Sequence, residues 1–98
     1  QGSGTVDMFV NRLNKNLRHL KRQAVRQGLA HFRVYDADLP EYAFSIDLFE
    51  TKAIVKEYQA PKSVDPQKVL KRRQEVLAVL PELLSLPARE IYFEILPR

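Results

Sequence analysis

The apolar positions near the start of the chain predict an amphipathic helix over about 6–28. They recur at steps of three and four residues, which places them on one stripe of a helix. These positions are Phe9, Val10, Leu13, Leu17, Leu20 and Ala24. Thr5 is the expected N-cap and Gly28 the expected C-terminal stop.

The next apolar pattern has a period of two residues. Residues 42–49 alternate between apolar and smaller or polar side chains, as a half-buried β-strand does. Shorter strands are expected at 32–36, 53–58 and 90–96. The segment 36–41 reads as a turn, because it combines two aspartates with Pro40. Residues 50–52 form a short hairpin connection, and 59–64 a linker.

Asp65 and Pro66 predict the start of a second helix. Aspartate at an N-cap accepts free amide hydrogens, and proline at the first helical position has no amide to leave unpaired. Pro81 should kink or restart this helix, since it cannot donate to the Leu77 carbonyl. Pro87 lies beyond its end. The apolar face comprises Val69, Leu70, Val76, Leu77, Leu80, Leu83 and Leu84.

The expected fold is α+β, with a mostly antiparallel four-stranded sheet, a basic N-terminal helix and a second helix before the last strand. A helix between the third and fourth strands also permits a parallel pair and thus a mixed sheet. Residues 1–4 resemble a remnant of cloning or protease cleavage. Residues 5–98 are interpreted as one accessory domain, a fragment of a longer protein.

The charge distribution predicts a function for the first helix. The net charge is +4, and residues 11–33 contain seven lysines and arginines but no acid. Five of these cations fall opposite the apolar stripe, which predicts a polyanionic partner held through phosphate contacts. They are Arg12, Lys15, Arg18, Arg22 and Arg26. A solvated surface helix is the alternative, and a membrane-surface helix is disfavoured because the sheet needs the stripe.

No set of residues predicts catalysis or metal binding. Asp36, Asp38, Glu41 and Asp47 could bind a cation, but turn chemistry explains the first two. His31, Ser45 and Asp47 lack the nucleophile elbow of a hydrolase. The histidines lack metal-ligand spacing, and three glycines cannot form a cofactor loop. Tyr35, Tyr42, Tyr58 and Tyr92 could stack on bases, although core packing is the commoner role.

Absent cysteine excludes disulfides and thiolate metal sites, which fits a cytoplasmic location. The apolar runs are far shorter than the ~20 residues of a membrane span, so no membrane partner is expected.

Three segments resemble the bifunctional bacterial 23S rRNA guanine methyltransferases, which join an N2- to an N7-methylating unit. The resemblance covers nearly the whole chain after residue 4. It is strongest at 9–20 (Phe-Val-Asn-Arg-Leu-Asn-Lys-Asn-Leu-Arg-His-Leu), 33–42 (Arg-Val-Tyr-Asp-Ala-Asp-Leu-Pro-Glu-Tyr) and 57–62 (Glu-Tyr-Gln-Ala-Pro-Lys). In that family these segments start the N7 unit, ahead of its cofactor-binding fold.

The resemblance implies a non-catalytic RNA-docking domain. Its parent would use S-adenosylmethionine to methylate guanine N7 of 23S rRNA, with cofactor and catalytic motifs in an adjoining methyltransferase domain. Arg33 and Lys62 are weaker phosphate candidates. One alternative is a stand-alone module resembling a double-stranded RNA-binding domain, with Lys68, Lys71, Arg72 and Arg73 near the second helix start. A purely structural docking domain is another.

Overall fold

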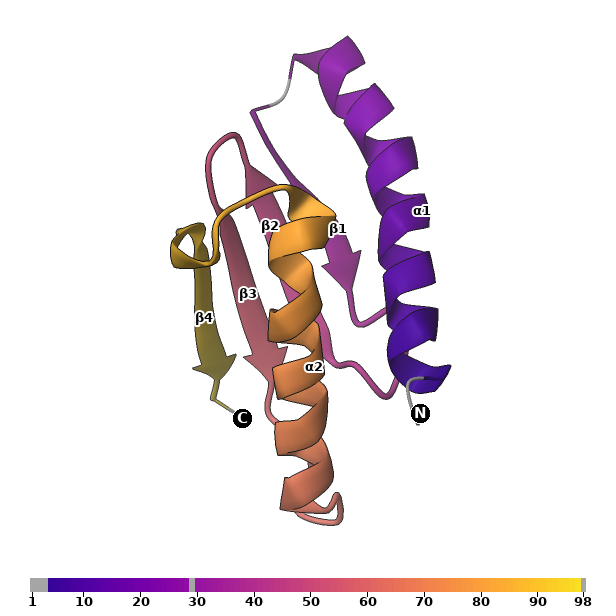
Figure 1. Ribbon diagram of the computed structural model, residues 1–98, viewed down its shortest axis with the longest axis vertical. Coiled ribbons are helices and arrows are strands. Elements are labelled where there is room, and N and C mark those ends of the chain that lie inside the picture. The colour runs from indigo at the N-terminus through magenta and orange to yellow at the C-terminus, as the bar shows by residue number, and fades with distance from the viewer. Residues whose placement is uncertain (1–3, 29, 98) are drawn as a thin grey trace.

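The computed structural model describes residues 4–28 and 30–97, which form a four-stranded mixed sheet with two helices (Figure 1). In chain order the elements are α1 (Gly4–Gln27), β1 (His31–Asp36), β2 (Phe44–Phe49), β3 (Ala53–Tyr58), α2 (Pro66–Leu84), the short 3-10 helix η1 (Ala88–Glu90) and β4 (Ile91–Leu96). The strand order is β1-β2-β3-β4. The first two pairs are antiparallel, and β3 pairs with β4 in parallel. The predicted α+β class is confirmed.

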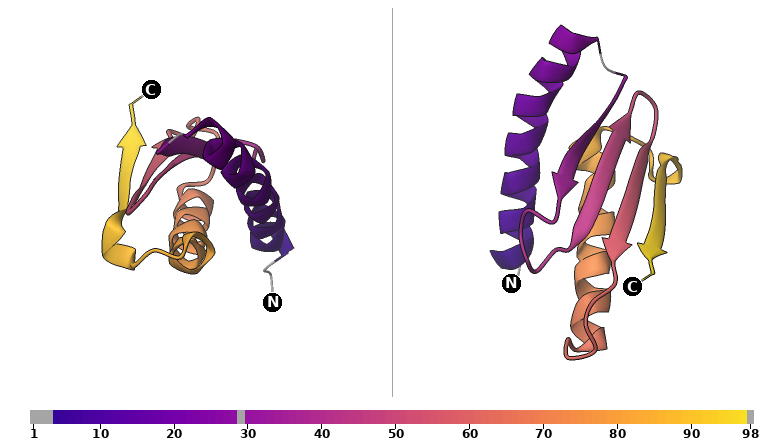
Figure 2. Two further views of the ribbon diagram at one scale, coloured as in Figure 1. Left: turned by 90° about the horizontal axis from the view of Figure 1, so that it is seen from above. Right: turned by 180° about the vertical axis from the view of Figure 1, so that it is seen from behind.

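Both helices cover the same face of the sheet and leave the opposite face open (Figure 2). The core lies between the helices and the sheet. Phe9, Leu13 and Leu17 of α1 are buried, as the apolar stripe predicted. Val76, Leu80 and Leu84 supply the buried face of α2. They pack against Ile46 of β2 and Val55 of β3, which are fully buried.

A β-bulge in β1 decides which side chains reach the core. Arg33 pairs with Asp47, but Tyr35 pairs with Ile46, so Val34 is one extra residue on β1. An inserted residue reverses the alternation of the strand beyond it. Tyr35 therefore turns toward the helices and is buried, while Asp36 turns to the open face.

The predicted boundaries hold best where a specific cap is present. Asp65 caps α2 by accepting a hydrogen bond from the Gln67 amide at 2.9 Å. Gly28 ends α1 with φ +67°, in the left-handed region that glycine adopts without strain.

Four details of the sequence prediction are wrong. The helix α1 begins at Gly4, so Thr5 lies inside it and is no N-cap. The strand β2 begins at Phe44, because Tyr42 forms an isolated bridge with Leu39 instead. Of the two alternatives at Pro81 the restart is wrong, because α2 is one helix to Leu84 and a proline in the last turn removes only one internal hydrogen bond; the kink stays a prediction. Glu90 belongs to η1 and not to β4. Residues 1–3 of the expected cloning remnant lie outside the described part of the chain.

Candidate nucleic-acid interface

The five cations predicted to contact phosphate lie together on the exposed side of α1, opposite its buried stripe. All five are exposed. We call this set the cationic face: Arg12, Lys15, Arg18, Arg22 and Arg26. At 1.5 Å per residue it extends for about 21 Å along the helix axis.

The cationic face lacks nearby acids of its own helix, because Asp7 in the first turn is the only acid between Gly4 and Gln27. Within residues 4–28 and 30–97, the ion pairs join other residues, and none includes a member of this face. Unpaired surface cations remain available to phosphate, and each phosphate contact releases condensed counterions. The arrangement therefore suits a polyanion.

Asn16 fixes the position of α1 against the sheet. Its amide donates to the carbonyl of Val34, the bulged residue of β1, at 2.9 Å and to the Asp38 carboxylate at 2.8 Å. A bulge leaves a backbone group outside the strand ladder, and here a helix side chain supplies the partner. The sequence does not reveal this role, because nothing in the local pattern sets Asn16 apart from Asn14.

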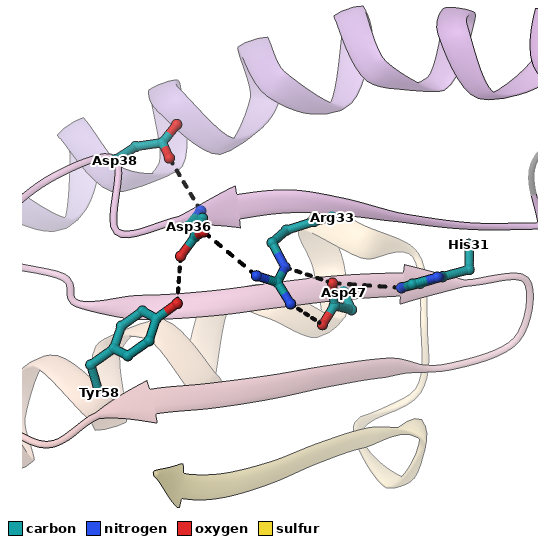
Figure 3. Close-up of polar contacts among 6 residues, drawn as sticks. All are labelled: His31, Arg33, Asp36, Asp38, Asp47 and Tyr58. Atoms are coloured by element: carbon teal, nitrogen blue, oxygen red, sulfur yellow. Dashed lines mark hydrogen bonds and ion pairs between the residues drawn. The ribbon is translucent and has the colours of Figure 1, made fainter. Parts of the chain in front are cut away.

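On the open face of the sheet, Asp47 is the centre of a polar network (Figure 3). Arg33 donates to both of its oxygens, Nε to Oδ1 at 2.9 Å and Nη2 to Oδ2 at 3.2 Å. His31 lies 3.6 Å from the same carboxylate. Hydrogen bonds from Arg33 lower the pKa of Asp47 despite its burial. The same contacts raise the pKa of Arg33. The carboxylate is held as an anion by its neighbours.

The carboxylates considered for a cation site instead contact neighbouring protein groups, except Glu41, which is exposed. Asp36 accepts a hydrogen bond from the Tyr58 hydroxyl at 2.6 Å and lies 3.5 Å from Arg33. The hydrogen bond to Asp36 raises the pKa of that tyrosine. Asp38 instead accepts from the Asp36 amide, a turn contact, and from Asn16. In the described part of the chain, no group of three or more metal-ligating side chains is arranged around a cation site.

His31, Ser45 and Asp47 do not form a catalytic triad. His31 contacts Asp47 but pairs in register with Phe49 at one end of β2, whereas Ser45 pairs with Asp36 toward the other end. Phe49 follows Ser45 by four positions in the strand, about 13 Å at 3.3 Å per residue. Ser45 is also buried.

The four tyrosines divide evenly between core and surface. Tyr35 and Tyr42 are buried and bonded to each other, since the Tyr35 hydroxyl donates to the Tyr42 carbonyl at 2.7 Å. Tyr42 in turn donates to Glu75 of α2. Tyr58 and Tyr92 lie on the open face of the sheet. Only these two could meet a nucleic-acid base.

The cations near the start of α2, which the double-stranded RNA-binding alternative would use, are less free. Arg73 donates to the buried Glu57 carboxylate at 2.7 Å and lies over the Phe93 ring. Lys68 and Lys71 are exposed. This surface therefore offers fewer free cations than α1.

Among the described residues, neither helix has the length and apolar content that crossing a membrane requires.

No protein-family model matches the chain. It is similar, however, to one region of proteins named "Ribosomal RNA large subunit methyltransferase K/L". The relative in Allochromatium vinosum is 45% identical over 91 residues, 90% of this chain and 12% of the relative. That in Methylococcus capsulatus is 44% identical over 92 residues, 91% of this chain and 12% of the relative. A Pseudomonas fluorescens Pf-5 relative is 51% identical over 78 residues, 80% of this chain and 10% of the relative.

The chain thus spans about one eighth of the length of the curated relatives it matches. It is related to a small region of rRNA methyltransferases. About nine-tenths of this chain aligns with each of the first two relatives.

Proposed function

We propose that the chain is a non-catalytic RNA-docking domain of an S-adenosylmethionine-dependent 23S rRNA methyltransferase that acts on guanine N7. One observation carries the proposal: the cationic face presents five exposed positive side chains on one side of α1, without an ion-pair partner among the described residues. The similarity to rRNA methyltransferases supports RNA as the polyanion.

In this function the cationic face holds RNA phosphates and sets the orientation of the strand. Phosphate contacts position a nucleic acid without reading its sequence. The adjoining domain supplies the cofactor and the chemistry, so the target guanine is delivered to that domain and not to this one. S-adenosylmethionine is assigned there, because this chain has only three glycines and no glycine-rich cofactor loop.

The test is the salt dependence of RNA binding by the 98-residue chain. Single-stranded RNA should show a log–log slope of about −0.7 for each phosphate neutralised, hence roughly −3.5 for five contacts. Replacing Arg18, Arg22 and Arg26 together by alanine should reduce the slope by about two units. The variant should remain folded, because these side chains are exposed.

A matched control removes the same charge elsewhere. Replacing Lys68, Lys71 and Arg72 together by alanine should leave the slope nearly unchanged. If this control loses the slope and the α1 variant keeps it, the interface lies on α2, as in a double-stranded RNA-binding domain. Failure of the unaltered chain to bind RNA at low salt would favour a purely structural docking domain.

The methylation assignment has a separate test. The reading frame that encodes this chain should continue past Arg98 into a cofactor-binding domain with methyltransferase motifs. Deleting residues 5–96 from that longer protein should reduce the yield of N7-methylguanine in 23S rRNA. Unchanged methylation in the deleted protein would contradict a docking role.

A further inference from the structure

Four side chains form a continuous row across one end of the open sheet face. The His31 ring stacks on the Phe49 ring, with centroids 4.3 Å apart and an interplanar angle of 12°. The Lys52 ammonium lies 5.5 Å from the Phe49 centroid and 5.9 Å from the Tyr92 centroid. We call His31, Phe49, Lys52 and Tyr92 the aromatic row. It draws on β1, β2, the β2–β3 connection and β4.

The row is accessible to a ligand. The side chain of His31 is 51% exposed, and Tyr92 is 51% exposed. A half-exposed tyrosine on a sheet face leaves part of its ring open to a ligand. Every nucleobase can stack on such a ring, and stacking is worth about 1–3 kcal/mol per base in other proteins. The Lys52 ammonium adds positive charge between the rings, where a phosphate of the same strand can approach.

The charges around the row favour an anionic ligand such as RNA over a basic or neutral partner. The two central carboxylates of the open face are already engaged, Asp47 by Arg33 and Asp36 by Tyr58. Glu94 lies beside Lys56 in the β3–β4 register. Lys52 has no carboxylate within ion-pair distance among the described residues.

The row also lies at the same end of the molecule as the last cations of α1. The chain leaves α1 and enters β1 within a few residues, at the end where β2 turns into β3 (Figure 1). His31 follows Arg26 by five positions, which limits their backbone separation to about 17 Å. A strand that follows the cationic face can therefore continue onto the open sheet face.

From this arrangement we infer that the aromatic row is a stacking platform for unpaired bases of a single-stranded RNA segment. The inference rests on the proposed function, and it adds a preference for unpaired over base-paired RNA. The cationic face supplies charge, and the row supplies contacts to bases. The two parts are separable by experiment.

The probe is an oligouridylate of about 12 nucleotides, a length within the range that single-strand binding surfaces cover. A ribose-phosphate oligomer of equal length without bases carries the same charge. Tyr92→Leu should weaken oligouridylate binding about 5- to 100-fold, with an unchanged salt slope. The same variant should bind the abasic oligomer as well as the unaltered chain does.

Tyr92→Phe is the matched control, because it keeps the ring and should bind oligouridylate normally. Phe49→Leu is a second variant and should also weaken binding, since Phe49 stacks on the His31 ring and lies below the Lys52 ammonium. Equal binding by the unaltered chain, Tyr92→Leu and Phe49→Leu would overturn the inference. So would Tyr92 ring resonances that saturating oligouridylate leaves unmoved.

The outcomes distinguish the inference from the proposed function. If Tyr92→Leu binds oligouridylate normally while the Arg18, Arg22 and Arg26 triple variant loses salt dependence, the stacking inference is wrong and the phosphate-docking proposal is supported. If neither oligomer binds at low salt, the stacking inference and the proposed RNA docking are both wrong. A Tyr92 ring that is protected by another protein and never by RNA would assign the row to a protein contact, against the inference.

Discussion

Arg33 and Asp47 face each other across the β1–β2 pair and are joined by two hydrogen bonds, of 2.9 and 3.2 Å. The pair lies on the open face of the sheet, yet Asp47 is buried, with 7% of its surface exposed. The Arg33 guanidinium covers the Asp47 carboxylate. A nearly buried charge in a small domain thus depends on one half-exposed partner.

Replacing Arg33 by alanine should therefore destabilise the fold by about 1–2 kcal/mol. Asp47 loses two charge-assisted hydrogen bonds and keeps only its contact with His31, while the partial exposure of Arg33 limits the loss. Urea unfolding followed by circular dichroism measures the change. Arg26→Ala is the matched control, because Arg26 is exposed on α1. Equal costs for the two variants would contradict a structural role for the pair.

Asp47 should contribute to the loss of folding stability at acidic pH. Its pKa in the folded protein lies below the ordinary value of 3.8, mainly through hydrogen bonds from Arg33. The resulting stabilisation is present above that value and is lost as the pH falls through the lowered folded pKa. In Asp47→Asn, stability should vary less with pH below about 4 than in the unaltered chain. Denaturation midpoints across that range test this; parallel curves would exclude Asp47 as the source.

Asn16→Ala should cost about 1–2 kcal/mol, because the Val34 carbonyl at the bulge and the Asp38 carboxylate both lose a donor. Asn14→Ala makes the same change in helix propensity at an exposed position of α1. The difference between the two free energies of unfolding isolates the contribution of the Asn16 contacts. No difference would mean that the bulge does not depend on α1.

Tyr35 should govern stability at alkaline pH. Burial raises its pKa from 10.0 to about 12. The neutral hydroxyl is favoured in the folded protein, so its contribution is complete below pH 10 and is lost as the pH rises toward 12, in all about 2–3 kcal/mol. Tyr35→Phe should lower stability at neutral pH, because the Tyr42 carbonyl loses its donor. The stability of Tyr35→Phe should also fall less between pH 10 and 12 than that of the unaltered chain. Tyr92→Phe, on the surface, should lose as much stability over that pH range as the unaltered chain.

Local rules account for much of this fold. The stripe from Phe9 to Ala24 predicts which side of α1 is buried and hence which side is cationic, because helical period alone places residues around an axis. The cap at Asp65 and the stop at Gly28 are equally local. The errors at Thr5, Tyr42 and Pro81 concern element ends, where one hydrogen bond decides the boundary.

The sequence by itself determined the class of fold, the two helices and the grouping of five cations on α1, since each depends on neighbours a few residues apart. The tertiary structure alone decided the parallel β3–β4 pair and the partners of Asp36, Asp38 and Asp47. It also brought His31, Phe49, Lys52 and Tyr92 together. These features depend on register between distant strands, and a single extra residue at Val34 reverses which side chains face the core.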